Sequence, residues 1–154
     1  MTDTSKDAFE QFCKACRRGD QQAARELFNS IDNIDAFDRV DTSPLMLAVR
    51  SSNVHLVRFL LDSGADVTCS NNDNFTALHE AAHVENNVDV LRLLIERGAH
   101  LNASTIHGDL PVEFAGCVAN LRCFLDAGLD PEEALAAANW TVVVTSSMSS
   151  SIVA

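Results

Sequence analysis

Hydrophobic residues along this chain recur in a fixed order at an interval of 33 or 34 residues. A short apolar motif opens each copy, and it reads SPLMLA at 43–48, TALHEA at 76–81 and LPVEFA at 110–115. A second apolar run with helical spacing follows each motif and ends in Gly, at 56–64, 90–98 and 121–128. Because a period of roughly 20–50 residues indicates stacked supersecondary units, each copy is predicted to form a helix, a tight turn, a second helix and an extended loop.

The residue types at the ends of these segments support the predicted helices. Ser43 precedes Pro44, a pair that suits an N-cap followed by the first turn of a helix. Gly64 and Gly98 fit the left-handed position just past a helix end. The segment from Asp130, DPEEALAAA, combines an N-cap, a Pro and two acids in its first turn, so it predicts a last helix that closes the stack.

The motif of the third unit and the period both resemble the ankyrin repeat, whose signature is Thr-Pro-Leu-His-x-Ala; the matching residues are Thr76, Leu78, His79 and Ala81. The resemblance implies an all-α fold, an ankyrin-repeat solenoid of stacked helix-turn-helix units with β-hairpin-like loops. The ankyrin domain would cover 5–140, with units at about 5–37, 38–70, 71–104 and 105–130 and a capping helix at 131–140. We expect 141–154 to be a disordered Ser-rich tail, or else a β-prone strip that associates with itself or with a partner.

Three units depart from the regular pattern. The first keeps the frame but lacks the usual Gly-Ala, as expected of an N-terminal capping repeat. The third has one extra residue between its helices, near 85–87, which should bulge the turn and leave both helices intact. From Ala115 to Gly128 is 13 residues, against 16 from Ala48 to Gly64, so about three residues are missing from the fourth unit. We therefore predict a shortened, tilted final repeat.

Charge is distributed unevenly along the chain, which has 22 acidic and 11 basic residues and a formal net charge of -11. Residues 1–28 hold five of each kind, so the whole excess lies beyond Phe28. This excess would repel a phosphate backbone, which excludes nucleic acid as a partner. It serves solubility, or it steers a partner protein with a basic surface into contact. With 47% hydrophobic and 21% charged residues, we expect a globular monomer that does not bind membranes.

The five cysteines do not suggest a disulfide framework, because their number is odd and three lie in predicted helices. Polar residues open the chain, with no apolar segment behind them to direct export, so we expect cytoplasmic and/or nuclear localisation. The pair Cys13 and Cys16 lacks a second pair at zinc-finger spacing, and Cys16 stands where later units carry Ala48 and Ala81. Zinc binding by this pair is therefore not predicted.

One segment, HEAAH at 79–83, matches the H-E-x-x-H of zinc peptidases, in which two His bind the metal and Glu acts as the base. Zinc-dependent hydrolysis by His79, Glu80 and His83 is therefore the alternative function. A third ligand at a usual spacing is missing, so we predict no catalytic residue, no metal and no cofactor. Instead we expect His79 to hydrogen-bond the backbone and hold a hairpin to its helix, and His83 to point toward the concave face.

The resemblance implies a non-enzymatic protein-protein interaction module, an adaptor, scaffold or inhibitor, that binds its partner with variable hairpin residues and the exposed ends of inner helices. Mapped through the repeat frame, the partner-binding residues are Arg39, Val40, Thr42, Arg50, Asn72, Asp73, Phe75, His83, Val84, Ile106, His107 and Asp109. Val40, Phe75 and Ile106 are predicted to form an apolar row of anchors. Alternatively, these three side chains fold back on adjacent hairpins and stiffen the stack.

Ankyrin repeats often resemble substrates of asparaginyl hydroxylases, which select a hairpin Asn several residues after a Leu. Asn102 follows Leu94 at such a distance, although His100 replaces the favoured Asp. Asn102 is therefore a candidate hydroxylation site, with a plain hairpin Asn as the alternative.

Overall fold

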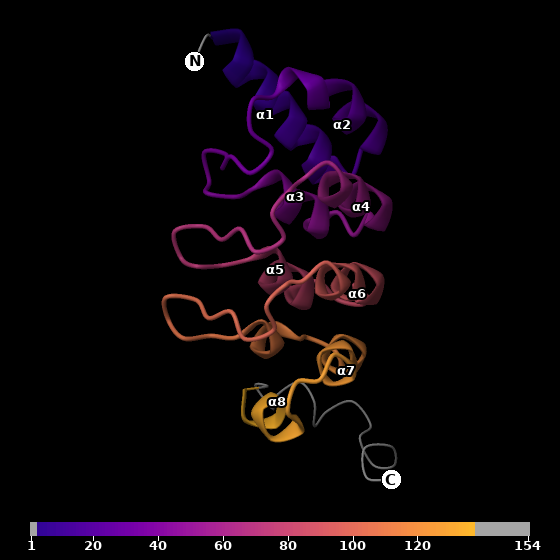
Figure 1. The fold of residues 1–154 in the computed structure, drawn as a ribbon, viewed down its shortest axis with the longest axis vertical. Helices are drawn as coiled ribbons and strands as arrows, with labels where there is room; N and C mark the ends of the chain where they lie inside the picture. Colours follow the sequence, from indigo (N-terminus) through magenta and orange to yellow (C-terminus); the bar gives the residue numbers. More distant parts are fainter. Residues whose placement is uncertain (1–2, 138–154) are drawn as a thin grey trace.

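The computed structural model describes residues 3–137, and the helices within that range stand in two columns along the long axis of the molecule (Figure 1). The column beside the projecting loops holds the inner helices α1 (Asp3–Arg18), α3 (Pro44–Arg50), α5 (Ala77–His83), the 3-10 helix η2 (Pro111–Phe114) and α8 (Pro131–Ala137). The outer column holds α2 (Gln21–Leu27), followed by the 3-10 helix η1 (Phe28–Ser30), and α4 (Val54–Asp62), α6 (Val88–Glu96) and α7 (Val118–Asp126). The predicted all-α solenoid is confirmed.

Helices are the regular secondary structure of the described residues, apart from one isolated bridge between Ser70 and Thr76 at the base of a loop. The last helix expected at 131–140 is present as α8 over Pro131–Ala137, whereas the rest of that range and the predicted tail at 141–154 lie outside the described residues. No helix between residues 3 and 137 is long and apolar enough to cross a membrane.

Small residues at one equivalent position let the inner helices pack closely. Cys16, Ala48 and Ala81 occupy this position in α1, α3 and α5, and all three are 0% exposed. Leu78 of α5 and Val112 of η2 are also fully buried in the same continuous core. Because a single helix pair cannot bury such a face, the stack of neighbouring units is what forms the core. A larger side chain at the small position would overpack it.

An asparagine at the start of each of the outer helices α4, α6 and α7 ties that helix to the preceding unit. Asn53, Asn87 and Asn120 each donate a side-chain N–H to a backbone carbonyl. The acceptors are Gly19 O at 2.8 Å, Val49 O at 3.4 Å, Ala82 O at 3.0 Å and Val84 O at 2.8 Å. These carbonyls lie at the C-terminal ends of inner helices, where partners within the helix are missing. The three asparagines recur at the repeat interval, and this spacing is the signal in the sequence that could have predicted the ladder.

The extra residue of the third unit and the shortening of the fourth are both present, whereas the tilt expected of the last repeat stays a prediction. Four residues, 84–87, separate α5 from α6, against the three residues 51–53 between α3 and α4. In the fourth unit, the four-residue η2 replaces a seven-residue α-helix, while α7 keeps the nine residues of α4 and α6. The missing residues therefore come from the inner helix, and the outer column continues at full length.

The inner helix of the first unit is longer than the others, with 16 residues in α1 against seven in α3 and α5. In the later units, a projecting loop leads into the inner helix. In the first unit, helical residues take that place, so that α1 lies beside the loop at 31–40 that follows η1 (Figure 1).

Candidate functional site

Three loops project from the inner column, and we call them fingers 1, 2 and 3: residues 38–42, 71–75 and 105–109. Each finger is closed by the same backbone hydrogen bond, from the N–H of its first residue to the carbonyl of its fifth. The donor and acceptor pairs are Asp38 to Thr42, Asn71 to Phe75 and Thr105 to Asp109, each at 3.0 Å. The three fingers therefore share one backbone conformation despite unlike sequences.

The first side chain of each finger holds the loop from inside. Oδ1 of Asp38, Oδ1 of Asn71 and Oγ1 of Thr105 each accept from the backbone N–H groups of the third and fifth finger residues, at 2.9 to 3.2 Å. The fourth residue adopts a positive φ in every finger, at Asp41 (58°), Asn74 (56°) and Gly108 (88°). Asp, Asn and Gly are the residue types that tolerate this conformation. These constraints leave the second and third residues at the tip.

Neighbouring fingers are also bonded to each other. The backbone N–H of Asn72 donates to a carboxylate oxygen of Asp41 at 2.9 Å, which joins finger 2 to finger 1. The N–H of Ile106 donates to the carbonyl of Asp73 at 3.0 Å, which joins finger 3 to finger 2. The three tips are therefore held in one row, and their side chains rather than their backbones differ.

Six predicted binding residues occupy the tips and are exposed: Arg39, Val40, Asn72, Asp73, Ile106 and His107. Val40 is 67% exposed and Ile106 is 57% exposed, and these are the largest exposures of big apolar side chains between residues 3 and 137. The structure thus brings these six residues together along the edge of the stack.

The fifth residue of each finger turns inward, so Thr42, Phe75 and Asp109 lie deeper than the tip residues. Phe75 is half-buried, with its ring 5.0 Å from the ring of His79 and 5.5 Å from that of Phe114 between centroids. Thr42 is only 5% exposed, and Asp109 accepts a hydrogen bond from the Thr105 hydroxyl at 3.1 Å. Phe75 therefore packs inward, as in the alternative given for the apolar row, because it corresponds to Thr42 in the repeat frame and not to Val40.

His79 links finger 3 to α5, as predicted. Its Nδ1 accepts from the backbone N–H of Thr76 at 3.1 Å, and its Nε2 lies 3.3 Å from the carbonyl of Asp109. The ring is 0% exposed, and its burial lowers the pKa, so the neutral form with the proton on Nε2 fits both contacts. Since both nitrogens are occupied, His79 is not available as a zinc ligand.

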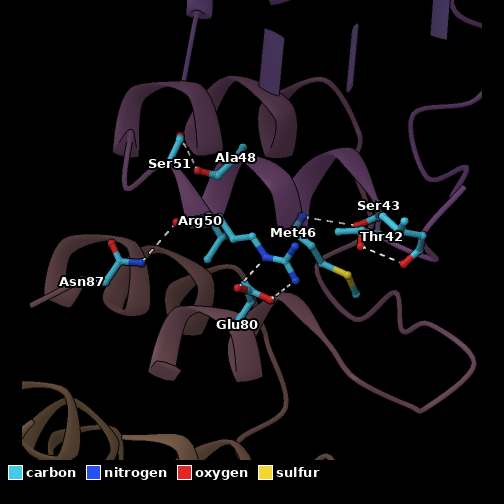
Figure 2. Close-up of polar contacts among 10 residues, drawn as sticks. Thr42, Ser43, Met46, Ala48, Arg50, Ser51, Glu80 and Asn87 are labelled. Atoms are coloured by element: carbon cyan, nitrogen blue, oxygen red, sulfur yellow. Dashed lines mark hydrogen bonds and ion pairs between the residues drawn. The ribbon is translucent and has the colours of Figure 1, made fainter. Parts of the chain in front are cut away.

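The acid of the HEAAH segment is also engaged in a structural contact. Glu80, whose side chain is 7% exposed, forms an ion pair with Arg50, at 2.7 Å from Nε to Oε1 and 2.9 Å from Nη2 to Oε2. Figure 2 shows the guanidinium of Arg50 facing this carboxylate across α3 and α5. His83 is exposed at the end of α5. No group of three or more metal-ligating side chains comes together among residues 3–137.

The remaining predicted residues differ in how accessible they are. Arg50 keeps 48% of its side chain exposed while bound to Glu80, so it presents a fixed cation on the inner surface. Val84 is half-buried, and its carbonyl accepts from Asn120. Asn102, the candidate hydroxylation site, is exposed in the turn that leads from α6 to finger 3.

The comparison with known families agrees with this geometry. The family model for ankyrin repeats, in three copies, matches residues 12–105, which is more than half of the chain. The chain belongs to the ankyrin-repeat family. The matched range holds the three ankyrin units that include fingers 1 and 2, and it leaves out the first nine residues of α1 and the shortened fourth unit.

Similar proteins include several named "Ankyrin repeat, SAM and basic leucine zipper domain-containing protein 1". Those of Notamacropus eugenii and Mus musculus are 36% and 34% identical to this chain over 110 residues, and that of Ornithorhynchus anatinus is 34% identical over 115 residues. The alignments cover 69%, 69% and 72% of this chain but 23%, 23% and 24% of those proteins. This ankyrin chain therefore spans about a quarter of the length of the relatives it matches.

A cavity of about 580 Å³ lies between α1 and the loop that carries finger 1, and we call it the α1 cleft. One stripe of α1, from Ser5 to Arg17, forms one wall. The other wall is the loop segment 32–40, which ends at the tip of finger 1. This cleft was not predictable from the repeat spacing, because it depends on the extra length of α1 and on the place of the finger 1 loop beside it.

The buried cysteines of the ankyrin core are not reactive groups. Burial raises the pKa of Cys13 and of Cys16 to about 12, so both thiols stay protonated at neutral pH. Both residues are at most 3% exposed. They act as small apolar side chains in the packing of α1.

Proposed function

We propose that this ankyrin chain is a non-enzymatic protein-protein interaction module, an adaptor, scaffold or inhibitor, that binds a partner protein with its finger tips and the adjoining inner helices. The observation that carries the proposal is the row of three fingers with one shared backbone and six exposed, unlike tip residues. A rigid frame with variable side chains is what recognition requires. Enzymatic chemistry has no comparable support, since His79 and Glu80 are both engaged in structural contacts.

Rigidity of the fingers favours binding on energetic grounds. Each immobilised side chain or loop costs free energy on association, and a loop that is already ordered in the free protein avoids most of that cost. Val40 and Ile106 are the natural anchors, because a partner that covers them removes their exposed apolar surface from water. Asp73 and His107 form the polar rim beside them.

Charge indicates the kind of partner that approaches the fingers. Beyond Phe28 the chain carries 17 carboxylates against six Arg, because five of the 22 acids and five of the 11 bases lie before that point. The negative electrostatic field of these carboxylates would steer a partner with a basic surface to fingers 2 and 3. This attraction would weaken in high salt. We propose a monomer that meets such a partner in the cytoplasm or nucleus.

Site-specific photo-crosslinking tests the proposal. A photoreactive phenylalanine analogue replaces Val40, Ile106 or Arg58, where Arg58 is an exposed residue of the outer helix α4 and serves as the matched control. We expect one partner protein to be captured from both finger positions and not from position 58. The purified partner should then bind a Val40→Ser/Ile106→Ser variant at least about tenfold more weakly, with an unchanged melting temperature. Equal capture from position 58 would contradict a binding surface on the fingers.

A further inference from the structure

The α1 cleft has the dimensions of a peptide-binding groove. The stripe of α1 that lines it runs from Ser5 to Arg17, which at 1.5 Å per residue is about 18 Å long. An extended chain covers that length with about five or six residues. The volume of about 580 Å³ lies within the range of ordinary ligand sites.

Apolar side chains form the floor of the cleft, and polar contacts cross its mouth. Phe9 and Ala36 are half-buried, and Cys13 is 3% exposed. Across the mouth, Ser5 donates to Asp32 at 2.6 Å, Arg17 pairs with Asp38 at 2.9 Å, and Arg39 pairs with Glu10 at 3.1 Å. Ion pairs this exposed contribute little to stability, so a ligand can replace the one at Arg39, whose side chain is 76% exposed.

The charge of the cleft is opposite to that of the rest of the chain. Four cations line it, Lys6, Lys14, Arg17 and Arg39, against the three carboxylates Glu10, Asp32 and Asp38. Elsewhere the sequence holds seven basic and 19 acidic residues, and the two lysines of the cleft are the only lysines of the chain. Glu10 is shared, since it lies 3.8 Å from Nζ of Lys14 and 3.1 Å from Nη2 of Arg39. Two cations that share one carboxylate can accept a second carboxylate from a ligand.

We propose that the α1 cleft binds a short peptide segment of a partner protein in which a large apolar side chain is flanked by acidic residues. The inference rests on the proposed function, because it assigns to the interaction module a second contact beside the fingers. The apolar side chain packs on Phe9 and Phe37, and the flanking carboxylates bind Lys14 and Arg39. The acidic surface outside the cleft repels the same carboxylates, so the segment is directed to this one place.

The test selects peptides with the full chain and then maps where they bind. A phage-displayed library of random peptides about 12 residues long, twice the length that the cleft covers, is panned on the full chain. Enriched peptides are synthesised with a fluorescent label, and their affinity is measured by fluorescence anisotropy. We expect them to combine an aromatic or large aliphatic residue with at least two Asp or Glu, and to bind more weakly as salt rises from about 0.05 to about 0.5 M.

Three variants separate the cleft from the fingers. Lys14→Glu/Arg39→Glu should weaken binding by at least about tenfold, and Lys14→Gln/Arg39→Gln by a smaller factor, while Ile106→Ser on finger 3 should leave it unchanged. Thermal melting of each variant checks that it is folded, which is expected because all three side chains are exposed. Basic or wholly polar peptides, peptides unaffected by the charge changes, or no enrichment at all would overturn the inference. Peptides that respond only to Ile106→Ser would overturn it while supporting the finger surface.

Discussion

Replacing Phe75 by Ser should destabilise the fold, although Phe75 lies in a projecting finger. Burying a whole Phe side chain contributes about 1.5–3 kcal/mol, so a half-buried ring accounts for about 1 kcal/mol. Its ring contacts with His79 and Phe114 add about 0.5–1.5 kcal/mol each. The expected loss is therefore about 2–4 kcal/mol of the free energy of unfolding, or about 10 °C in melting temperature.

Urea unfolding followed by circular dichroism measures this loss, and Val40→Ser is the matched control. Val40 is 67% exposed on the neighbouring finger, so the same kind of exchange should change stability by less than about 0.5 kcal/mol. A double-mutant cycle with Phe114→Ala should give a coupling free energy of about 0.5–1.5 kcal/mol between the two rings. A loss below about 0.5 kcal/mol for Phe75→Ser, together with zero coupling, would refute the inward packing of Phe75.

Three further predictions concern other contacts. Arg50→Met should lower the free energy of unfolding by about 2 kcal/mol, because it leaves the buried Glu80 carboxylate without its cation. In urea titration, the double variant Arg50→Met/Glu80→Gln should recover part of this loss. Equal losses in both variants would argue against the ion pair. The pKa of His79 lies below its usual 6.5, so the unfolded chain takes up a proton on this side chain at a higher pH than the folded chain does. The free energy of unfolding should therefore be constant above pH 6.5 and fall below it, by at most about 1.4 kcal/mol per pH unit. The variant His79→Gln should lose this part of the pH dependence. In the native chain, a disulfide reagent at pH 8 should modify the half-exposed Cys69 and Cys117 well before Cys13 and Cys16, whereas all five cysteines should react at similar rates in guanidinium. Fast reaction of Cys13 in the native chain would contradict its burial.

The irregular units show how much of the fold the repeat spacing predicts. Counting residues between motifs predicted both the extra residue before α6 and the shortening of the fourth unit, because each helix pair must keep its register with its neighbours. Counting could not say which helix lost residues. The structure shows that η2 is the shortened element, since α7 must match the length of α6 to keep the outer column packed.

The candidate site was predictable in part. Six tip residues follow from the repeat frame alone, because the second and third positions of a finger are exposed in any unit. Thr42 and Phe75 were grouped with the tip residues because the fingers had not been aligned on their positive-φ residues, Asp41, Asn74 and Gly108. The interval between these three residues equals the repeat, so the correct register was present in the sequence.

Apolar spacing and helix-end residues fix the repeat unit, its period and the order of its helices, because they act over a few neighbouring positions. The contacts between units depend on the stacked fold: Arg50 with Glu80, Phe75 with Phe114, and Asn120 with the end of α5. Each of these contacts joins residues at least 30 positions apart, and it exists only because stacking brings equivalent faces together. The α1 cleft has the same origin, since a longer first helix forms a groove only where finger 1 lies beside it.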